Sequence, residues 1–218
     1  MSRSSVAAMA AAVALAGCPL PQPLPDYPPG TITPPRILVD EIAGNAEVVR
    51  FVPAGCAKEP VYPLTATLND ANTLETVEAR WFVNYDARDQ LHYLAYRDDP
   101  IPPDPDPLVL TRVVPPADPA GNPQPFQFAA YQYPPPHGAP ALPGPPWSDA
   151  GIVRVVELVV SNGFDPAAVD NPASPLPNRA TLTAPTVFET QVYRWVFVSV
   201  AASVSCAPDQ PGCVTCPP

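Results

Sequence analysis

Beyond Pro35 the chain is divided into short runs of β-forming residues by Pro, Asn, Asp and Gly, and no long window keeps the 3.6-residue spacing of an amphipathic helix. Proline accounts for 37 of the 218 residues, about three times its usual ~5% share. Because 46% of the residues are nevertheless apolar, the chain can still fill an interior. This pattern predicts an all-β fold with long Pro-rich loops.

The candidate strands alternate in polarity, as strands with one dry face and one wet face do. Leu64, Ala66 and Leu68 alternate with threonines, and the same alternation along residues 77–85 places Trp81 in the core. A Pro-flanked turn at residues 165–168 is expected to begin one turn of helix. Nine runs suit two packed sheets: 37–42, 47–52, 61–69, 77–85, 91–96, 108–114, 126–131, 152–161 and 190–200.

The first 18 residues, MSRSSVAAMAAAVALAGC, have the layout of a secretory signal. Arg3 gives a cationic start, residues 6–15 are apolar, and small residues precede Cys18. The apolar stretch reaches only about a dozen residues, whereas a membrane-spanning helix needs roughly 20, so cleavage is expected rather than a permanent span.

The end of this segment, Leu15-Ala16-Gly17-Cys18, resembles the bacterial lipobox at every position. The resemblance implies that the Cys18 thiol receives a diacylglycerol, that residues 1–17 are removed as a signal peptide, and that the new amino terminus is acylated. Two or three acyl chains hold a protein stably on a membrane, where one holds it only marginally. Position 19 is Pro rather than the Asp of inner-membrane retention, so the outer membrane is expected. The alternative is an ordinary signal peptide with Cys at the cut.

Three further segments complete the expected organisation. Residues 18–35 comprise the lipidated Cys18 and a Pro-rich tether that favours extended polyproline II. Residues 36–205 form one β-sandwich domain, and residues 206–218 form a Cys- and Pro-rich tail.

Three stretches, TATLNDANTLETVEARWFVNYD, GIVRVVELVVSNGF and VYRWVFVSV, resemble bacterial immunoglobulin-like and PKD-like sandwich modules. The resemblance implies an immunoglobulin-like antiparallel β-sandwich with Trp81 on strand C, Leu158 on strand F and Trp195 on strand G. No Cys stands on strand B or F, so a bridge between those strands is excluded. The lipobox, Pro-rich leader, sandwich and Cys-rich end together resemble uncharacterised lipoproteins of myxobacteria and related groups.

Besides Cys18 the chain holds an even number of cysteines, as expected of an exported protein with structural disulfides. Three pairings are possible, and we favour Cys56 with one of the tail cysteines, because that bridge would clamp an early loop to the end of the last strand. The CxxC of the tail would suit zinc only with a second ligand pair, and redox chemistry only at the start of a helix in a βαβ unit. The disulfide candidates are Cys56, Cys206, Cys213 and Cys216.

Aromatic residues around the Pro-rich insert YQYPPPHGAPALPGPPW form a candidate binding surface for protein or glycan, namely Tyr131, Tyr133 and Trp147. The alternative is that these rings pack over an end of the sandwich.

Acidic side chains offer the hard oxygen ligands that Ca²⁺ prefers, although their spacing matches no EF-hand. A solvated loop is the alternative interpretation. Asp70 and Asn72 form one such group, and the low-ranked calcium candidates of the other are Asp98, Asp99, Asp104 and Asp106.

No catalytic motif is present: the sequence has no GxSxG elbow, no glycine-rich phosphate loop and no HExxH. His92 is expected on a half-exposed strand and His137 in an exposed loop. The net charge of −10 argues against nucleic acid as a partner. We expect no cofactor and no enzyme, but a membrane-anchored lipoprotein whose sandwich contacts an envelope or surface protein. A carbohydrate-binding or calcium-dependent adhesive module is the alternative.

Overall fold

The computed structural model describes residues 33–38, 49–104, 106, 108–131, 151–184, 187–203 and 214–218. All of them belong to the unit that runs from Ile32 to Pro218. The lipobox and nearly all of the predicted tether therefore lie outside the described residues. Of the tether, only residues 33–35 are described; they lead into the first strand, and Thr33 is already buried there.

The described residues are almost entirely β, as the sequence predicts. They contain one four-residue helix, α2 (Gln90–Tyr93), and one 3-10 turn, η2 (Pro166–Ala168), which forms where the Pro-flanked turn was expected. The strands are β1 (Arg36–Leu38), β2 (Val49–Ala54), β3 (Val61–Leu64), β4 (Ala66–Asn69), β5 (Val77–Val83), β6 (Arg97–Ile101), β7 (Thr111–Val114), β8 (Phe126–Ala129), β9 (Val153–Ser161) and β10 (Gln191–Ala201).

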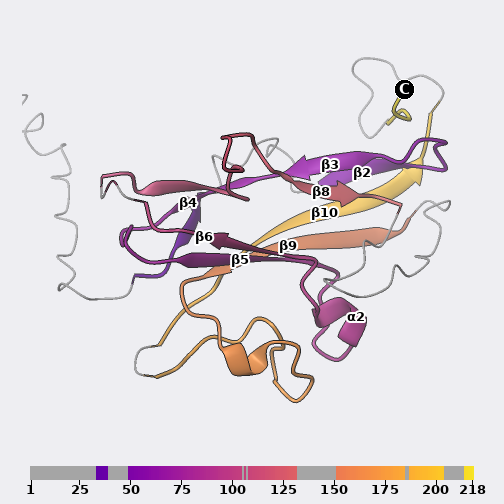
Figure 1. Cartoon of the computed structure of the whole chain (residues 1–218). Helices are drawn as coiled ribbons and strands as arrows, with labels where there is room; N and C mark the ends of the chain where they lie inside the picture. Colours follow the sequence, from indigo (N-terminus) through magenta and orange to yellow (C-terminus); the bar gives the residue numbers. More distant parts are fainter. Residues whose placement is uncertain are drawn as a thin grey trace, which may run out of the picture. The chain divides into compact units, whose positions relative to one another are not determined.

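The strands form a five-stranded sheet in the order β2-β10-β9-β5-β6, a three-stranded sheet β1-β4-β7 and a two-stranded sheet β3-β8 (Figure 1). All pairs are antiparallel except β2 with β10. Only Thr65 separates β3 from β4, so the predicted run 61–69 pairs with β8 along its first half and with β7 along its second. The two smaller sheets thus share one long stretch of chain.

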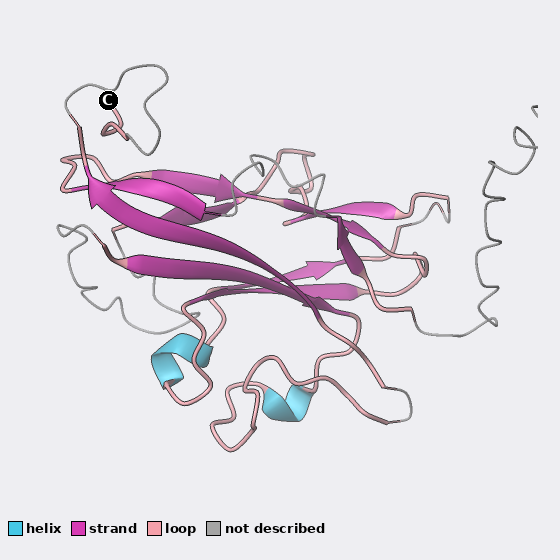
Figure 2. Cartoon of the chain, turned by 180° about the vertical axis from the view of Figure 1, so that it is seen from behind, coloured by secondary structure: helices cyan, strands magenta, loops and turns pink. Residues whose placement is uncertain are grey.

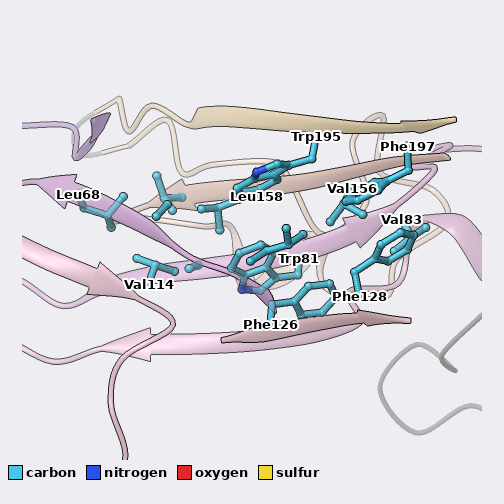
Figure 3. Close-up of a cluster of buried hydrophobic side chains, with 14 of the residues drawn as sticks. Leu68, Trp81, Val83, Val114, Phe126, Phe128, Val156, Leu158, Trp195 and Phe197 are labelled. Carbon is cyan, nitrogen blue, oxygen red and sulfur yellow. The ribbon is translucent and has the colours of Figure 1, made fainter. Parts of the chain in front are cut away.

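Side chains from all three sheets meet in one apolar core (Figure 3). Trp81 of β5 is fully buried there, as its alternation pattern predicts. Its ring stacks on Phe126 with 4.6 Å between centroids and on Trp195 with 5.7 Å. The indole Nε1 donates a hydrogen bond of 2.9 Å to Asp99 Oδ2. The buried indole is therefore packed on both faces and its donor is satisfied.

Prolines within the described strands occur only in strands at a sheet edge. They are Pro53 in β2, Pro63 in β3 and Pro100 in β6. The central strands β4, β5, β9 and β10 contain none. Because proline has no amide hydrogen to donate, it is tolerated at an edge and discourages another strand from pairing there. The high proline content is thus compatible with regular β-sheets.

The strand predicted over residues 91–96 is wrong. Asp89 caps a helix instead, because its carboxylate accepts hydrogen bonds from the Leu91 amide at 3.0 Å and from His92 Nδ1 at 2.7 Å. The bond from His92 lowers the pKa of the Asp89 carboxyl. His92 therefore lies on α2, not on a half-exposed strand as predicted. Local capping outweighs the β propensity of this aromatic stretch.

Strand β6 (Arg97–Ile101) was not predicted, because Asp-Asp-Pro is typical of a turn. It forms by antiparallel pairing with β5, in which Arg97 lies opposite Trp81. Its charged side chains are satisfied, since Asp99 accepts hydrogen bonds from Arg97 Nε at 2.7 Å and from the Trp81 indole. Tertiary contacts override local propensity here.

Candidate functional site

The outer face of the five-stranded sheet is divided into a covered half and an exposed half. The covered half lies under the segment 162–182, which contains η2, and beside α2 (Figure 2). Phe82 and Val159 of the sheet pack there against Ala95 and Phe164 in a second apolar cluster.

Charged side chains attach this covering segment to the sheet. The Arg179 guanidinium carbon lies 3.4 Å from the centroid of the Tyr85 ring and 4.5 Å from that of Phe82. Arg179 also pairs with Glu157, whose other carboxylate oxygen accepts from Arg194 Nε at 2.5 Å. Burial lowers the pKa of the Arg179 guanidinium, and the Glu157 carboxylate opposes that change. These charged side chains therefore attach the segment 162–182 to the sheet.

Asn178 fixes the end of the same segment. It is buried, has a positive φ of 58°, and donates from Nδ2 to the Tyr93 carbonyl at 3.0 Å. The backbone carbonyl of Asn178 accepts from an Arg80 guanidinium nitrogen at 2.7 Å, and the Arg80 guanidinium carbon lies 4.0 Å from the Phe164 ring centroid. Asparagine tolerates this left-handed conformation better than most residues.

The exposed half carries two apolar rows that cross β2, β10 and β9. Residues directly opposite one another in neighbouring strands share a face. The register places the members of each row opposite one another, so that the rows read Val49, Val196, Val155 and Phe51, Val198, Val153. We call these six residues the apolar face. Val49 and Phe51 are each 41% exposed and Val153 is 53% exposed, while the other three are half-buried.

A hollow of about 590 Å³ adjoins the apolar face at Val155. Asn84, with a positive φ of 52°, forms one wall by exchanging two hydrogen bonds of 2.8 Å with the Val155 backbone. The remaining lining residues are Tyr85, Asp86, Ala87, Glu157 and Arg194. The hollow lies between the covered half, where Tyr85 and Glu157 are, and the exposed half, where Val155 is.

The apolar face was not predicted, although the sequence contains a signal for it. The run VRVVELVVS of β9 and the run RWVFVSV of β10 have apolar residues at successive positions, not only at alternate ones. Such continuous runs indicate strands with apolar side chains on both faces. The folded registers of β9 and β10 show which of these residues stay exposed.

Of the three aromatic candidates for binding, only Tyr131 lies within the described residues. Its hydroxyl donates to the Pro53 carbonyl and accepts from the Cys56 amide at 3.0 Å. Its own amide donates to Glu59 Oε1 at 2.6 Å. Tyr131 thus packs against the core and holds the loop after β2. Tyr133, Trp147 and His137 lie outside the described part of the chain.

The favoured cysteine pairing is present: a disulfide joins Cys56 to Cys216 of the tail. The two Cα atoms are 5.5 Å apart and 160 residues separate them in sequence. Lys58 Nζ adds a hydrogen bond of 3.0 Å to the Pro218 carbonyl. Cys206 and Cys213 lie outside the described residues.

The acidic calcium candidates do not converge. Asp98 and Asp99 are consecutive in β6 and so point to opposite faces, with Asp98 3.9 Å from Arg80 and Asp99 bonded to Trp81. Asp104 and Asp106 each accept a backbone amide two residues ahead, at 2.9 Å, and so close local turns. Among the described residues no three acidic, histidine or cysteine side chains gather as a metal would require.

Asp70 and Asn72, the other calcium candidates, lie in an oxygen-lined cage that the Arg112 guanidinium occupies. Arg112 donates to Asp70 Oδ2 at 2.5 Å, and to the Glu75 and Pro102 carbonyls at 3.0 and 3.1 Å. Burial raises the pKa of the Asp70 carboxyl, while the Asn72 amide and Arg112 oppose the rise. Sequence could not reveal this partner, because Arg112 is 42 residues away from Asp70.

We expect Ca²⁺ to leave the melting temperature unchanged, because Arg112 already neutralises Asp70 and the carboxylates of Asp98 and Asp99 point apart. Thermal unfolding in millimolar Ca²⁺ and in EDTA, with Mg²⁺ as the control ion, measures this. A melting temperature that rises and saturates with Ca²⁺ alone would contradict the prediction.

No helix in the part of the chain that the structure describes has the length and apolar character needed to cross a membrane. Comparison of the chain with protein-family models, with curated proteins and with solved structures finds no match.

Proposed function

We propose that this chain is an exported lipoprotein, attached to the outer membrane through Cys18, whose immunoglobulin-like sandwich makes protein contacts and performs no catalysis. The observation that carries the proposal is the apolar face. Contiguous apolar patches at the surface of soluble domains are often interaction sites.

The order of the strands supports the immunoglobulin-like assignment. Trp81, Leu158 and Trp195 lie on β5, β9 and β10, which are consecutive neighbours in the five-stranded sheet. The resemblance in sequence assigns these residues to strands C, F and G, which are neighbours in immunoglobulin domains. Trp81 fills the core position expected of the strand C tryptophan.

The contacts of the charged groups support a role in binding rather than in catalysis. Glu157, Arg179 and Arg194 neutralise one another beside the hollow, and Asp70 is neutralised by Arg112. Each of these groups has a partner within the fold, and among the described residues the exposed apolar side chains offer a surface for a protein partner.

Attachment to the membrane is tested on the native chain. We expect a mature mass that starts at Cys18 with added acyl chains, and a protein that fractionates with the outer membrane of a Gram-negative host. The Cys18→Ala variant should lose the added mass and leave the membrane fraction, because no other residue can accept the lipid. An unmodified soluble product from the native sequence would overturn the anchor.

A further inference from the structure

We infer that the hollow beside Val155 binds a neutral saccharide. In this complex the Tyr85 ring packs on the C–H groups of a sugar ring, the Arg194 guanidinium donates to two neighbouring hydroxyls, and the Asp86 carboxylate accepts from a further hydroxyl. Such binding goes beyond the proposed protein contact and is independent of the lipid anchor. Three properties of the hollow carry the inference: a fixed aromatic ring, unused polar groups that can donate and accept, and balanced charge.

The aromatic ring of Tyr85 is held in one orientation by its neighbours. Its hydroxyl donates to the Pro177 carbonyl at 2.9 Å, and its ring meets the Phe82 ring edge to face, with 5.2 Å between centroids. The Arg179 guanidinium stacks over the ring at 3.4 Å. Tyr85 lines the hollow and Arg179 does not, so the side of the ring that faces the hollow is not the side that Arg179 covers. A ring already fixed offers apolar contact at little cost in conformational entropy.

Arg194 supplies the donors. Its Nε donates to Oε1 of Glu157, which lies directly opposite on β9, at 2.5 Å. The other oxygen of Glu157 accepts from Arg179, so Glu157 positions Arg194 and has no oxygen left without a partner. Within the described residues, neither terminal nitrogen of Arg194 has a hydrogen-bond partner, and its side chain is 60% exposed. The planar guanidinium can therefore donate to two neighbouring hydroxyl oxygens at once.

Asp86 supplies the acceptor from the loop after β5. Its Oδ1 accepts from the Arg88 amide at 2.9 Å, whereas its Oδ2 accepts from no group in the described part of the chain. The loop is fixed by Asn84, which exchanges two hydrogen bonds of 2.8 Å with the Val155 backbone. A sugar hydroxyl both donates and accepts, so it can use both kinds of group. The volume of about 590 Å³ lies within the range of small-molecule sites.

The charge of the hollow favours a neutral ligand. Two arginines, Arg179 and Arg194, face the carboxylates of Glu157 and Asp86, so the positive and negative charges balance. A phosphate or carboxylate ligand would be attracted by Arg194 but repelled by both carboxylates. A neutral polyhydroxylated ligand avoids that repulsion and still forms hydrogen bonds with the charged groups, which are stronger than those between neutral groups.

A glycan array tests the inference. The full chain is purified from a Gram-negative host in lauryldimethylamine oxide, a detergent without sugar, and is applied to an array of neutral and acidic glycans. We expect binding to neutral glycans. Titration calorimetry with the strongest neutral glycan then measures the affinity, which should stay the same between about 0.05 and 0.5 M NaCl because the ligand has no charge to screen.

Three variants locate the site by the same titration. Arg194→Ala should weaken binding about tenfold or more, because it removes hydrogen bonds from a charged donor. Arg194→Lys should weaken it to a similar extent, because an ammonium keeps the charge but not the planar arrangement of donors. Arg36→Ala removes an exposed arginine of β1, in another sheet, and should leave the affinity unchanged. The melting temperature of each variant checks that it is folded.

Failure to bind any neutral glycan would overturn the inference. So would binding restricted to acidic glycans that salt weakens and Arg194→Lys retains, which would indicate an anion site. Equal losses for Arg194→Ala and Arg36→Ala would also overturn it, because the glycan would then bind elsewhere. A lipidated chain that binds no neutral glycan refutes the saccharide site and leaves the anchor intact.

Discussion

Replacing Arg112 with alanine is expected to lower the free energy of unfolding by about 4 kcal/mol. The side chains of Arg112 and Asp70 are only 5% and 0% exposed, so the substitution leaves a buried carboxylate without its counter-charge. It also leaves the Glu75 and Pro102 carbonyls without a donor. Denaturant unfolding of the native chain and the variant, followed by tryptophan fluorescence, measures the loss.

Arg194→Ala provides the matched control. Arg194 donates to Glu157 at the same distance of 2.5 Å, but its side chain is 60% exposed. Water can solvate the Glu157 carboxylate when Arg194 is removed, so the expected loss in the free energy of unfolding is below about 1 kcal/mol. Arg112→Lys should fall between the two variants, because lysine keeps the charge but cannot reach several acceptors as a guanidinium does. Equal losses for Arg112→Ala and Arg194→Ala would contradict the assignment of Arg112 as a buried structural cation.

Removing the disulfide with the pair Cys56→Ala and Cys216→Ala is expected to cost about 4 to 5 kcal/mol. The bridge closes a loop of 160 residues, and the chain-entropy model gives about 5 kcal/mol for a loop of that length. The loss arises mainly in the unfolded state, which gains conformations when the bridge is absent. Equilibrium unfolding of the native chain and the double variant under non-reducing conditions measures this loss in the free energy of unfolding.

Lys58→Ala is the control for the disulfide. It removes the hydrogen bond from Lys58 to the Pro218 carbonyl and leaves the bridge in place. Because Lys58 is exposed, we expect a change of only about 0.5 kcal/mol or less. A similarly small change for the cysteine pair would mean that the bridge does not constrain the unfolded chain.

Strand β5 and its core tryptophan could be predicted from sequence because their signal is local. Alternation with period two places Val77, Ala79, Trp81 and Val83 on one face whatever the partner strands are, and all four are buried. The stretch after β5 shows where such reasoning fails. Its aromatic residues favour a strand, but the carboxylate of Asp89 accepts a hydrogen bond from the Leu91 amide and caps a helix, and the unpredicted strand β6 follows at Arg97–Ile101.

The candidate sites depended on contacts between residues far apart in the sequence. In sequence, Asp70 and Asn72 are consistent with a calcium loop. In the folded chain the Arg112 side chain, which comes from β7, occupies the position that a cation would take. In sequence, Tyr131 is consistent with an exposed aromatic residue. In the folded chain its hydroxyl donates a hydrogen bond to the Pro53 carbonyl. In both cases a buried polar group requires a partner, and only the folded chain determines which one it finds.

The sequence by itself determined the all-β class, the burial of Trp81 and the expectation that Cys56 bridges to the tail, because alternation and cysteine parity are properties of the chain alone. Only the tertiary structure decided that Cys56 pairs with Cys216, that Arg112 takes the place of a cation, and that the apolar face remains exposed. The physical reason is register: which side chains of neighbouring strands lie opposite one another depends on hydrogen bonds between segments that no local pattern encodes.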